Sequence, residues 1–292
     1  MTRSARSRRV LFFLHPERPE LAKRLRPLLS SLARAGFGPE VLPATPESDL
    51  AGMVRRIKPK LVVSIGGDGT ILAAARALVG TSYPLLPVNL GGLGYLASAE
   101  GKDVGRAVRA ALRGEGVRDS RRLMSVDISR SDRAFRRLGT AVNDATIRQG
   151  PTFRALRAEL ELDGNPLGML LADGLVVATA TGSTAYSLSA GGPVLLPGVD
   201  ALVATPVCPH TLASRSLVFG EQQSLLARIV SRDEGTTLSL DGTAGLALAR
   251  GDAVRFSLSS DRVTFLRLSH DRGLGALRSK LGWQGSPESR SP

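Results

Sequence analysis

The residue whose type and setting most clearly suggest chemistry is Asp68, which lies within Gly66-Gly67-Asp68-Gly69-Thr70. The glycines have no side chains, so a ligand can approach the backbone closely. An aliphatic run, 61–65, precedes them and alanine- and leucine-rich sequence, 71–78, follows, so we expect a strand, a tight loop and a helix. Free N–H groups at a helix start can bind phosphate oxygens. A carboxylate there is suited to accepting a proton or holding a metal ion.

The same five residues are also typical of a β-turn, because aspartate bonds to its own backbone and glycine adopts positive φ. They do not match the P-loop pattern, which ends in Gly-Lys-Ser or Gly-Lys-Thr, nor Gly-x-Gly-x-x-Gly. By themselves they are therefore compatible with a phosphate site and with a plain turn, and the rest of the chain must decide.

The composition is that of a folded protein outside the membrane. The 292 residues suffice for two domains, and 42% of them are hydrophobic. An apolar run at 10–14 follows the basic residues 1–9 but is too short for the core of a secretory signal peptide. No stretch of eighteen apolar residues occurs, so we expect a cytoplasmic protein without a membrane span.

The chain has one cysteine, which excludes an internal disulfide and a multi-cysteine zinc site. Its three histidines argue against a histidine-rich metal site. We interpret Cys208, which has apolar neighbours, as an inert packed residue. The net charge of +13 is spread along the chain and aromatic residues are only 4%, so no nucleic-acid partner is expected. A basic nucleic-acid-binding module is the non-enzymatic alternative.

Residues 1–120 are predicted to form an α/β domain, because apolar strands alternate with amphipathic helices and such alternation favours a parallel sheet. The expected strands are 10–14, 40–42, 61–65 and 83–89, and the expected helices are 20–35, 49–57, 71–78 and 103–112. Ligands of parallel sheets bind beyond the carboxyl ends of the strands. The Asp68 turn and the loop 89–95 should both lie there.

Residues 121–268 are predicted to form a β-rich, sandwich-like domain, since short alternating segments are separated by polar or glycine-bearing breaks. The segments are 123–128, 156–162, 174–179, 224–230, 236–240 and 253–258. Asp241-Gly242 is read first as a hairpin turn and second as part of a site. Residues 269–284 are expected to be helical, and 285–292, rich in serine and proline, to be a disordered tail.

A second constellation lies in the β-rich half. Residues 173–193 lead from a strand into a loop dense in hydroxyl groups and small side chains, which suits ribose hydroxyls and the edge of a base. The alternative is a surface loop, with Tyr186 as a packed aromatic residue. Downstream, prolines at 206 and 209 bracket Cys208 and precede His210, which indicates a fixed corner in which His210 is structural.

Taken together, these motifs resemble those of the NAD kinases. The resemblance is carried by 66–70, Asn143-Asp144, 173–193 and 206–212, with the loop 89–95, in the family's order over most of the chain. The first motif is shared with diacylglycerol, sphingosine and 6-phosphofructo kinases, and the third is much more specific. The resemblance implies an α/β domain followed by a β-rich domain, with the active site between them. It also implies transfer of the γ-phosphoryl group of ATP, or of polyphosphate in some members, to the 2′-hydroxyl of the adenosine ribose of NAD.

The family's roles carry over to individual residues. Asp68 matches the general base, although orienting the hydroxyl or anchoring a hydrated metal stays open as its role. The positions implied to bind substrate or cofactor are Gly67, Gly69, Asn143, Asp144, Arg154, Asp173, Thr184, Ala185, Tyr186 and Ser189. Without the resemblance, Asp144 and Asp173 would be read as turn residues. The implied cofactors and partners are ATP, Mg²⁺ or another divalent cation, NAD as substrate, and further copies of the chain in a homodimer or homotetramer.

The chain departs from the family pattern at four positions. Members often have arginine or lysine where Ala73 stands, a basic residue or histidine at Leu171, proline at Ala180, and glutamine or asparagine at Thr243. These departures put single contacts in doubt without affecting Asp68. A lipid or sugar kinase with the same glycine turn is the alternative enzyme, but it leaves 173–193 unexplained.

Overall fold

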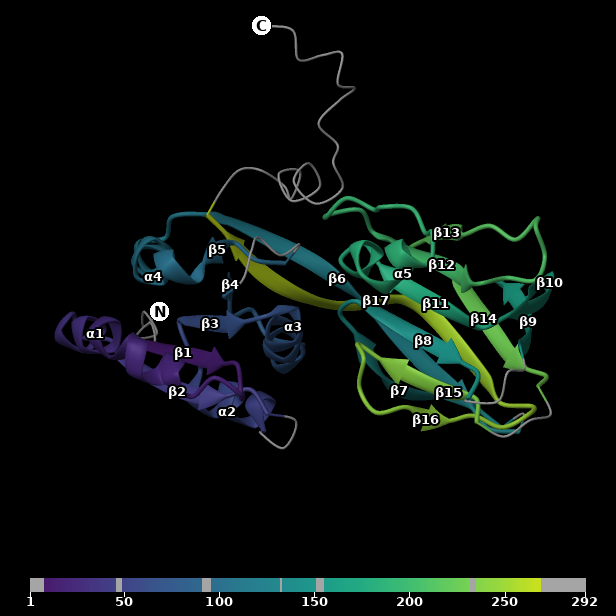
Figure 1. Cartoon of the computed structure of the whole chain (residues 1–292), viewed down its shortest axis with the longest axis horizontal. Coiled ribbons are helices and arrows are strands. Elements are labelled where there is room, and N and C mark those ends of the chain that lie inside the picture. The colour runs from purple at the N-terminus through teal and green to yellow at the C-terminus, as the bar shows by residue number, and fades with distance from the viewer. Residues whose placement is uncertain are drawn as a thin grey trace, which may run out of the picture. The chain divides into compact units, whose positions relative to one another are not determined.

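The computed structural model describes residues 8–45, 49–90, 96–131, 133–150, 155–231 and 235–268 (Figure 1). It divides into two units: unit 1 contains the residues up to Ser120 and those from Val263, and unit 2 is Arg121–Arg262. Residues 263–268 were predicted to belong to the β-rich domain, whereas the structure places them in unit 1. The predictions for 91–95, Arg154, 269–284 and 285–292 lie outside the described residues.

Unit 1 follows the predicted alternation of strands and helices. Its elements are β1 Arg9–Leu14, α1 Glu20–Arg34, β2 Gly38–Pro43, α2 Leu50–Ile57, β3 Leu61–Gly66, α3 Asp68–Ala77, β4 Leu85–Asn89, β5 Ala99–Glu100, η1 Gly101–Asp103, α4 Val104–Arg113 and the start of β6 Val117–Ser129. In the sheet, β1 lies between β2 and β3, and β4 pairs with β3, β5 and the end of β17 Ala253–Arg267. All of these pairings are parallel, so the predicted parallel sheet is confirmed.

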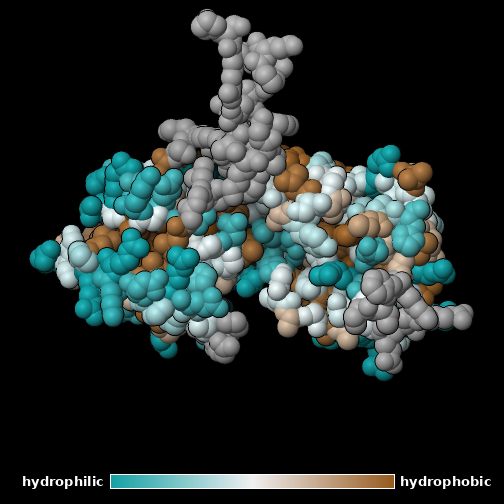
Figure 2. Space-filling view, viewed as in Figure 1, coloured by the Kyte–Doolittle hydropathy of each residue, from teal (hydrophilic) through white to brown (hydrophobic). Residues whose placement is uncertain are grey.

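Helices cover this sheet through the apolar side that their periodicity predicts. Leu21, Leu25, Leu28 and Leu32 of α1 are buried against apolar side chains of β1, β3 and β4. Hydrophilic side chains cover a large part of the face of unit 1 that is seen at the left of Figure 2. A side-chain cap starts α2, because the Asp49 carboxylate accepts the N–H of Gly52 at 2.8 Å.

Unit 2 is built almost entirely of strands. After β6 they are β7 Arg136–Ala141, β8 Asp144–Arg148, β9 Leu156–Leu162, β10 Asn165–Ala172, β11 Gly174–Thr179, β12 Ala201–Val207, β13 Leu217–Gly220, β14 Ser224–Ile229, β15 Thr237–Leu240, β16 Leu246–Ala247 and the first part of β17. Two short helical segments, η2 Gly182–Thr184 and α5 Tyr186–Ser189, interrupt them between β11 and β12.

These strands form the two layers of a sandwich. One layer has the order β10-β9-β14-β17, with β6 pairing with β17 and β7, and the other has the order β13-β12-β11-β8-β15-β16. A single apolar core contains Leu156 and Phe256 from the first layer together with Val177, Leu202 and Phe219 from the second. The side chains of the two inner faces therefore pack on each other, which confirms the predicted sandwich-like arrangement.

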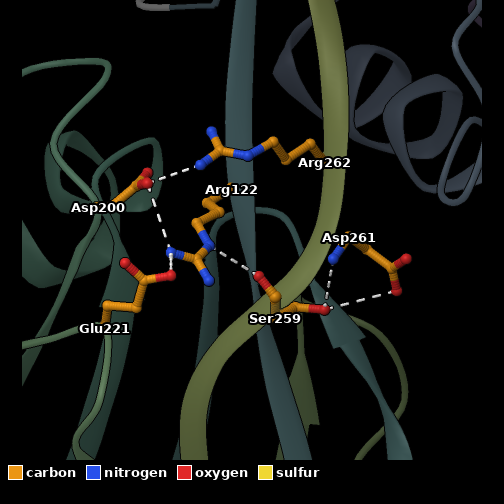
Figure 3. A network of polar contacts seen from close by, with 6 residues as sticks. All are labelled: Arg122, Asp200, Glu221, Ser259, Asp261 and Arg262. Atoms are coloured by element: carbon orange, nitrogen blue, oxygen red, sulfur yellow. Dashed lines mark hydrogen bonds and ion pairs between the residues drawn. The ribbon is translucent and has the colours of Figure 1, made fainter.

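β6 and β17 are much longer than the predicted strands 123–128 and 253–258. Polar residues in both strands interrupt the hydrophobic alternation. In unit 2, Arg122 of β6 and Arg262 of β17 find partners in a network of ion pairs and hydrogen bonds (Figure 3). Asp200 accepts from Arg262 at 2.6 Å and from Arg122 at 3.4 Å, while Arg122 also pairs with Glu221 and donates to the Ser259 carbonyl. Because these partners are distant in sequence, the local sequence pattern alone underestimates the lengths of the two strands.

Candidate functional site: a glycine-bounded aspartate and a buried Asn-Asp pair

Asp68 lies at the junction of β3 and α3, as predicted. β3 is buried along its whole length and ends at Gly66, Gly67 is extended with φ −84° and ψ −175°, and α3 begins at Asp68. The alternative of a β-turn is wrong here, because Asp68 and Gly69 already belong to the helix. A Cβ atom on Gly66 would lie 2.3 Å from Thr70 Oγ1, so the close strand-to-helix connection needs glycine at this position.

The outer side of this junction is open. A Cβ atom at Gly67 or Gly69 would meet nothing within 4 Å, and Asp68 and Gly69 are exposed. Within the described part of the chain, the Asp68 side chain has no hydrogen bond or ion pair. The N–H groups of a first helical turn lack partners inside the helix, and the helix dipole makes this end partly positive. The junction thus offers donors for an anion beside an accessible carboxylate.

In unit 2, the Asp241 carboxylate organises the residues before β8. It accepts the N–H groups of Val142 at 2.9 Å, Asn143 at 2.7 Å and Asp144 at 3.2 Å. Asp241 and Gly242 have φ values of +48° and +70° and lie between the antiparallel strands β15 and β16, which confirms the predicted hairpin turn. The turn also returns a bond, from Asp241 N to the Asp144 carbonyl at 2.8 Å. One residue thus makes the turn and fixes the backbone of the predicted binding pair.

Asp144 is buried, with 9% of its surface exposed. Burial and, to a smaller extent, the nearby Asp241 charge together raise the pKa of its carboxyl to about 6, while a hydrogen bond from Thr146 acts in the opposite direction. Its neighbour Asn143 is 8% exposed, and the Asn143 Oδ1 atom is buried without a hydrogen-bond partner in the structure. A buried acceptor without a partner is costly, so this atom has unused capacity for a ligand.

The end of β11 packs directly on the Asn143 backbone. Thr179 N donates to the Asn143 carbonyl at 2.8 Å, Thr179 Oγ1 donates to the Val142 carbonyl at 2.7 Å, and Gly182 N donates to Thr179 Oγ1. A Cβ atom on Gly182 would lie 2.1 Å from the Asn143 carbonyl oxygen, so only glycine allows this approach. The loop that begins here therefore lies against the Asn143-Asp144 pair.

This loop carries four of the predicted binding residues. Thr184 and Ala185 are half-buried, whereas Tyr186 is 37% exposed and Ser189 is exposed. The ring of Tyr186 is therefore not fully packed, which disfavours the alternative of a core aromatic residue. A hydrogen bond between Ser187 Oγ and Thr205 Oγ1, which lie 2.9 Å apart, anchors this loop to β12. In unit 2 the structure thus brings the Asn143-Asp144 pair and the start of the 182–189 segment together.

Asp173 lies elsewhere. It precedes β11, where Gly174 pairs with Arg148, whereas Ala178 at the other end of the strand pairs with Asp144. At about 3.3 Å per residue, the five steps from Asp173 to Ala178 span roughly 17 Å. Asp173 is exposed, and its backbone N–H donates to the Val207 carbonyl at 2.9 Å. Within one copy of the chain, Asp173 is therefore not part of the Asn143-Asp144 cluster.

Two further observations bear on the sequence analysis. Cys208 was interpreted as packed, but it is exposed and has a positive φ of +46°, because it directly follows the end of β12. His210 takes part in the corner through its backbone, whose N–H donates to the Leu171 carbonyl at 2.9 Å. The residue that sequence reasoning missed as an organiser is Asp241. Its only local signal was the Asp-Gly turn, which does not show which N–H groups the carboxylate binds.

Among the described residues, no group of three or more His, Cys, Asp or Glu side chains is placed to hold a metal ion. A search of the same residues finds no helix with the length and apolar character that crossing a membrane requires.

Comparison with known proteins decides the family. The model of the ATP-NAD kinase N-terminal domain matches residues 48–116, and that of the ATP-NAD kinase C-terminal domain matches residues 142–268. The NAD kinase of Acidobacterium capsulatum is 36% identical over 283 residues, which are 94% of this chain and 99% of that protein. The chain belongs to the NAD kinase family. This NAD kinase has its matched N-terminal segment in unit 1, around the Asp68 junction, and most of its matched C-terminal segment in unit 2.

Solved structures confirm the fold of this NAD kinase. The crystal structure of yeast NADH kinase complexed with NADH has a TM-score of 0.83 at 23% identity and covers 97% of this chain and 89% of that one. An NAD kinase from Archaeoglobus fulgidus in complex with ATP has a TM-score of 0.73 at 22% identity, with coverage of 95% and 100%. Of the three interpretations of the sequence, membership of the family supports the NAD kinase and not the lipid or sugar kinase.

Proposed function

We propose that this NAD kinase transfers the γ-phosphoryl group of ATP to the 2′-hydroxyl of the adenosine ribose of NAD, with Asp68 as the residue that receives the hydroxyl proton. The observation that carries the assignment of Asp68 is the open junction. There an exposed carboxylate starts a helix between two glycines, and a Cβ atom on either glycine would meet nothing within 4 Å. In the reaction, the ribose oxygen forms a bond to the γ-phosphorus, the bond from that phosphorus to the β–γ bridging oxygen breaks, and ADP leaves.

The junction supports this chemistry in two ways. Phosphoryl transfer depends mainly on positioning and on stabilisation of phosphate charge, which the N–H groups at Gly67, Asp68 and Gly69 can supply. A general base contributes about a hundredfold to ten-thousandfold. We propose that Mg²⁺ or another divalent cation enters bound to ATP and supplies further neutralisation of the phosphate charge.

For the binding of NAD we propose Asn143, Asp144, Thr184, Ala185, Tyr186 and Ser189, with Arg154 as a further contact. The support is the Asn143 Oδ1 atom without a partner, the buried carboxyl of Asp144, and the exposed ring of Tyr186 that follows. Buried groups of this kind can bind ribose hydroxyls, and an exposed aromatic ring offers a face to a planar group. Cytoplasmic localisation stays a prediction made from the sequence, and cell fractionation tests it.

The test of Asp68 compares the parent protein with Asp68→Asn in a coupled assay for NADP⁺ formation from NAD⁺, ATP and Mg²⁺. We expect turnover to fall by about a hundredfold or more while NAD binding is kept. The matched control is Asp49→Asn, which changes another aspartate at a helix start in unit 1 and keeps a good N-cap. Full turnover by Asp68→Asn would remove the proposed role of Asp68, and no NADP⁺ from the folded parent would overturn the proposed function.

We also propose that a homo-oligomer is the functional form, in which Asp173 of one copy contributes to the NAD site of another. The support is that Asp173 is exposed and lies next to the end of β11 that is remote from Asp144. Mixing inactive Asp68→Asn with inactive Asp173→Ala should then restore part of the activity, because mixed oligomers contain one intact site. Light scattering that shows a monomer, or mixing without any recovery, would contradict this proposal.

A further inference from the structure

A pocket of about 710 Å³ lies in unit 1 at the end of β3 opposite the Asp68 junction. Leu61, the first residue of β3, lines it, whereas Gly66 ends the same strand beside Asp68. Five residue steps of about 3.3 Å separate the two ends by roughly 17 Å. A ligand in this pocket would therefore not occupy the position proposed for the reacting phosphate.

Cations surround the pocket. Lys58, Lys60, Arg113 and Arg118 line it, and Glu115 is the acidic residue among its lining residues. Cations at helix carboxyl ends often serve only to offset the partial negative charge there. Lys60 fits that explanation, since its Nζ donates to the Leu112 carbonyl near the end of α4 at 3.2 Å, and Arg113 is paired with Glu115.

A helix end does not explain Arg118, and Lys58, the C-cap of α2, adds a third cation to an end that already has two. Neither side chain forms an ion pair or hydrogen bond with another residue in the part of the chain that the structure describes. Arg118 is an exposed residue of β6, outside any helix. Lys58 follows α2, whose last turn already contains Arg55 and Arg56. The chain thus places two further positive charges at the pocket without a structural partner.

The backbone at Lys58 strengthens the case. Lys58 has φ 49° and ψ 61°, the left-handed conformation in which a helix end ordinarily carries glycine or asparagine. Pro59 follows it and restricts its backbone further. Residues in sparsely populated backbone conformations cluster at functional and ligand-binding sites. A lysine kept at such a position, on the wall of a pocket, favours a role for its ammonium group.

The remaining walls indicate the shape of the ligand. Tyr83, Pro59 and Pro84 present flat or rigid apolar surface, and Tyr83 is only half-buried and has no hydroxyl hydrogen bond to another described residue. Pockets of a few hundred to about 1,000 Å³ that combine apolar walls with a few charged groups are typical of small-molecule sites. We propose that this pocket is a second ligand site, which binds a small molecule with a phosphate group and a planar ring, the chemistry of a nucleoside monophosphate.

The test uses the full chain and 8-azido-AMP as a photoreactive probe, with the labelled peptides identified by mass spectrometry. We expect labelling near Tyr83, competed by AMP but not by adenosine, and weakened by added salt. Lys58→Gly and Arg118→Ala should each reduce the labelling roughly fivefold. The matched control is Arg26→Ala, which removes an exposed arginine of α1 that does not line the pocket.

Lys58→Gly also separates binding from folding. Glycine relieves the left-handed backbone, so this variant should unfold at a temperature no lower than the parent while it loses the label. NADP⁺ formation, measured separately, should be unchanged in both pocket variants. Labelling that falls only on peptides of unit 2, that survives both substitutions, or that adenosine competes as well as AMP does would overturn the proposal.

Discussion

Replacing Asp241 with asparagine tests how one side chain fixes the Asn143-Asp144 pair. The Asp241 carboxylate accepts three backbone N–H groups, and hydrogen bonds to a charged group contribute about 1.5–3 kcal/mol each. Asparagine tolerates the left-handed backbone at this position. It keeps one acceptor oxygen, so its NH₂ group must face at least one of the three donors. We expect the free energy of unfolding to fall by about 2–4 kcal/mol.

The same substitution should change the titration of Asp144. In the parent, burial and the Asp241 charge raise the pKa of Asp144 from 3.8 to about 6. Its charged form is therefore disfavoured in the folded state, so this group makes the protein less stable as pH rises from about 4 to about 6. The difference of about two pH units corresponds to about 3 kcal/mol. In Asp241→Asn we expect a pKa below 6 but still above 3.8, because burial, the larger cause, remains.

Two assays check this prediction: carbon NMR of the Asp144 carboxyl during a pH titration, and urea unfolding of parent and variant at pH 5 and pH 7. The loss of stability between these pH values should be smaller in the variant. Asp163→Asn is the matched control, because Asp163 also has a positive φ before a glycine and its Oδ1 accepts the N–H of Ser224. An Asp144 pKa that does not change in Asp241→Asn, or changes equally in the control, would refute the reasoning.

Three further substitutions test single contacts. Gly182→Ala places a Cβ atom 2.1 Å from the Asn143 carbonyl oxygen, so it should lower the unfolding temperature and weaken NAD binding measured by calorimetry. Gly220→Ala is the control and should do neither, because the nearest neighbour of its Cβ atom is 3.9 Å away. Asp49→Ala removes the N-cap of α2 and should cost about 1 kcal/mol in urea unfolding; an unchanged midpoint would contradict this. Asp200→Asn removes the negative charge shared by the two arginines of Figure 3 and keeps one acceptor oxygen. It should cost about 1 kcal/mol, less at high salt, and a cost independent of salt would contradict an ionic origin.

The fold of unit 1 was largely predictable because its signals are local. The apolar spacing of α1, the continuous apolar run of β3 and the cap of α2 all lie within a few residues of the elements they define. In unit 2 the predictions for β9 and β11 match the observed strands. Strands β7, β8, β10, β12, β13 and β16 were not predicted, because short strands depend on pairing with neighbours that sequence pattern does not specify.

The sequence by itself determined the family, the Asp68 junction and the identity of most candidate residues, since glycines around one aspartate and a hydroxyl-rich loop are local chemical features. Only the tertiary structure decided that Asp241 binds the backbone of Asn143 and Asp144, nearly a hundred residues away in the chain. It alone also separated Asp173 from that pair and exposed Cys208. The physical reason is that burial, hydrogen-bond partners and pKa depend on which distant segments the folded chain packs together.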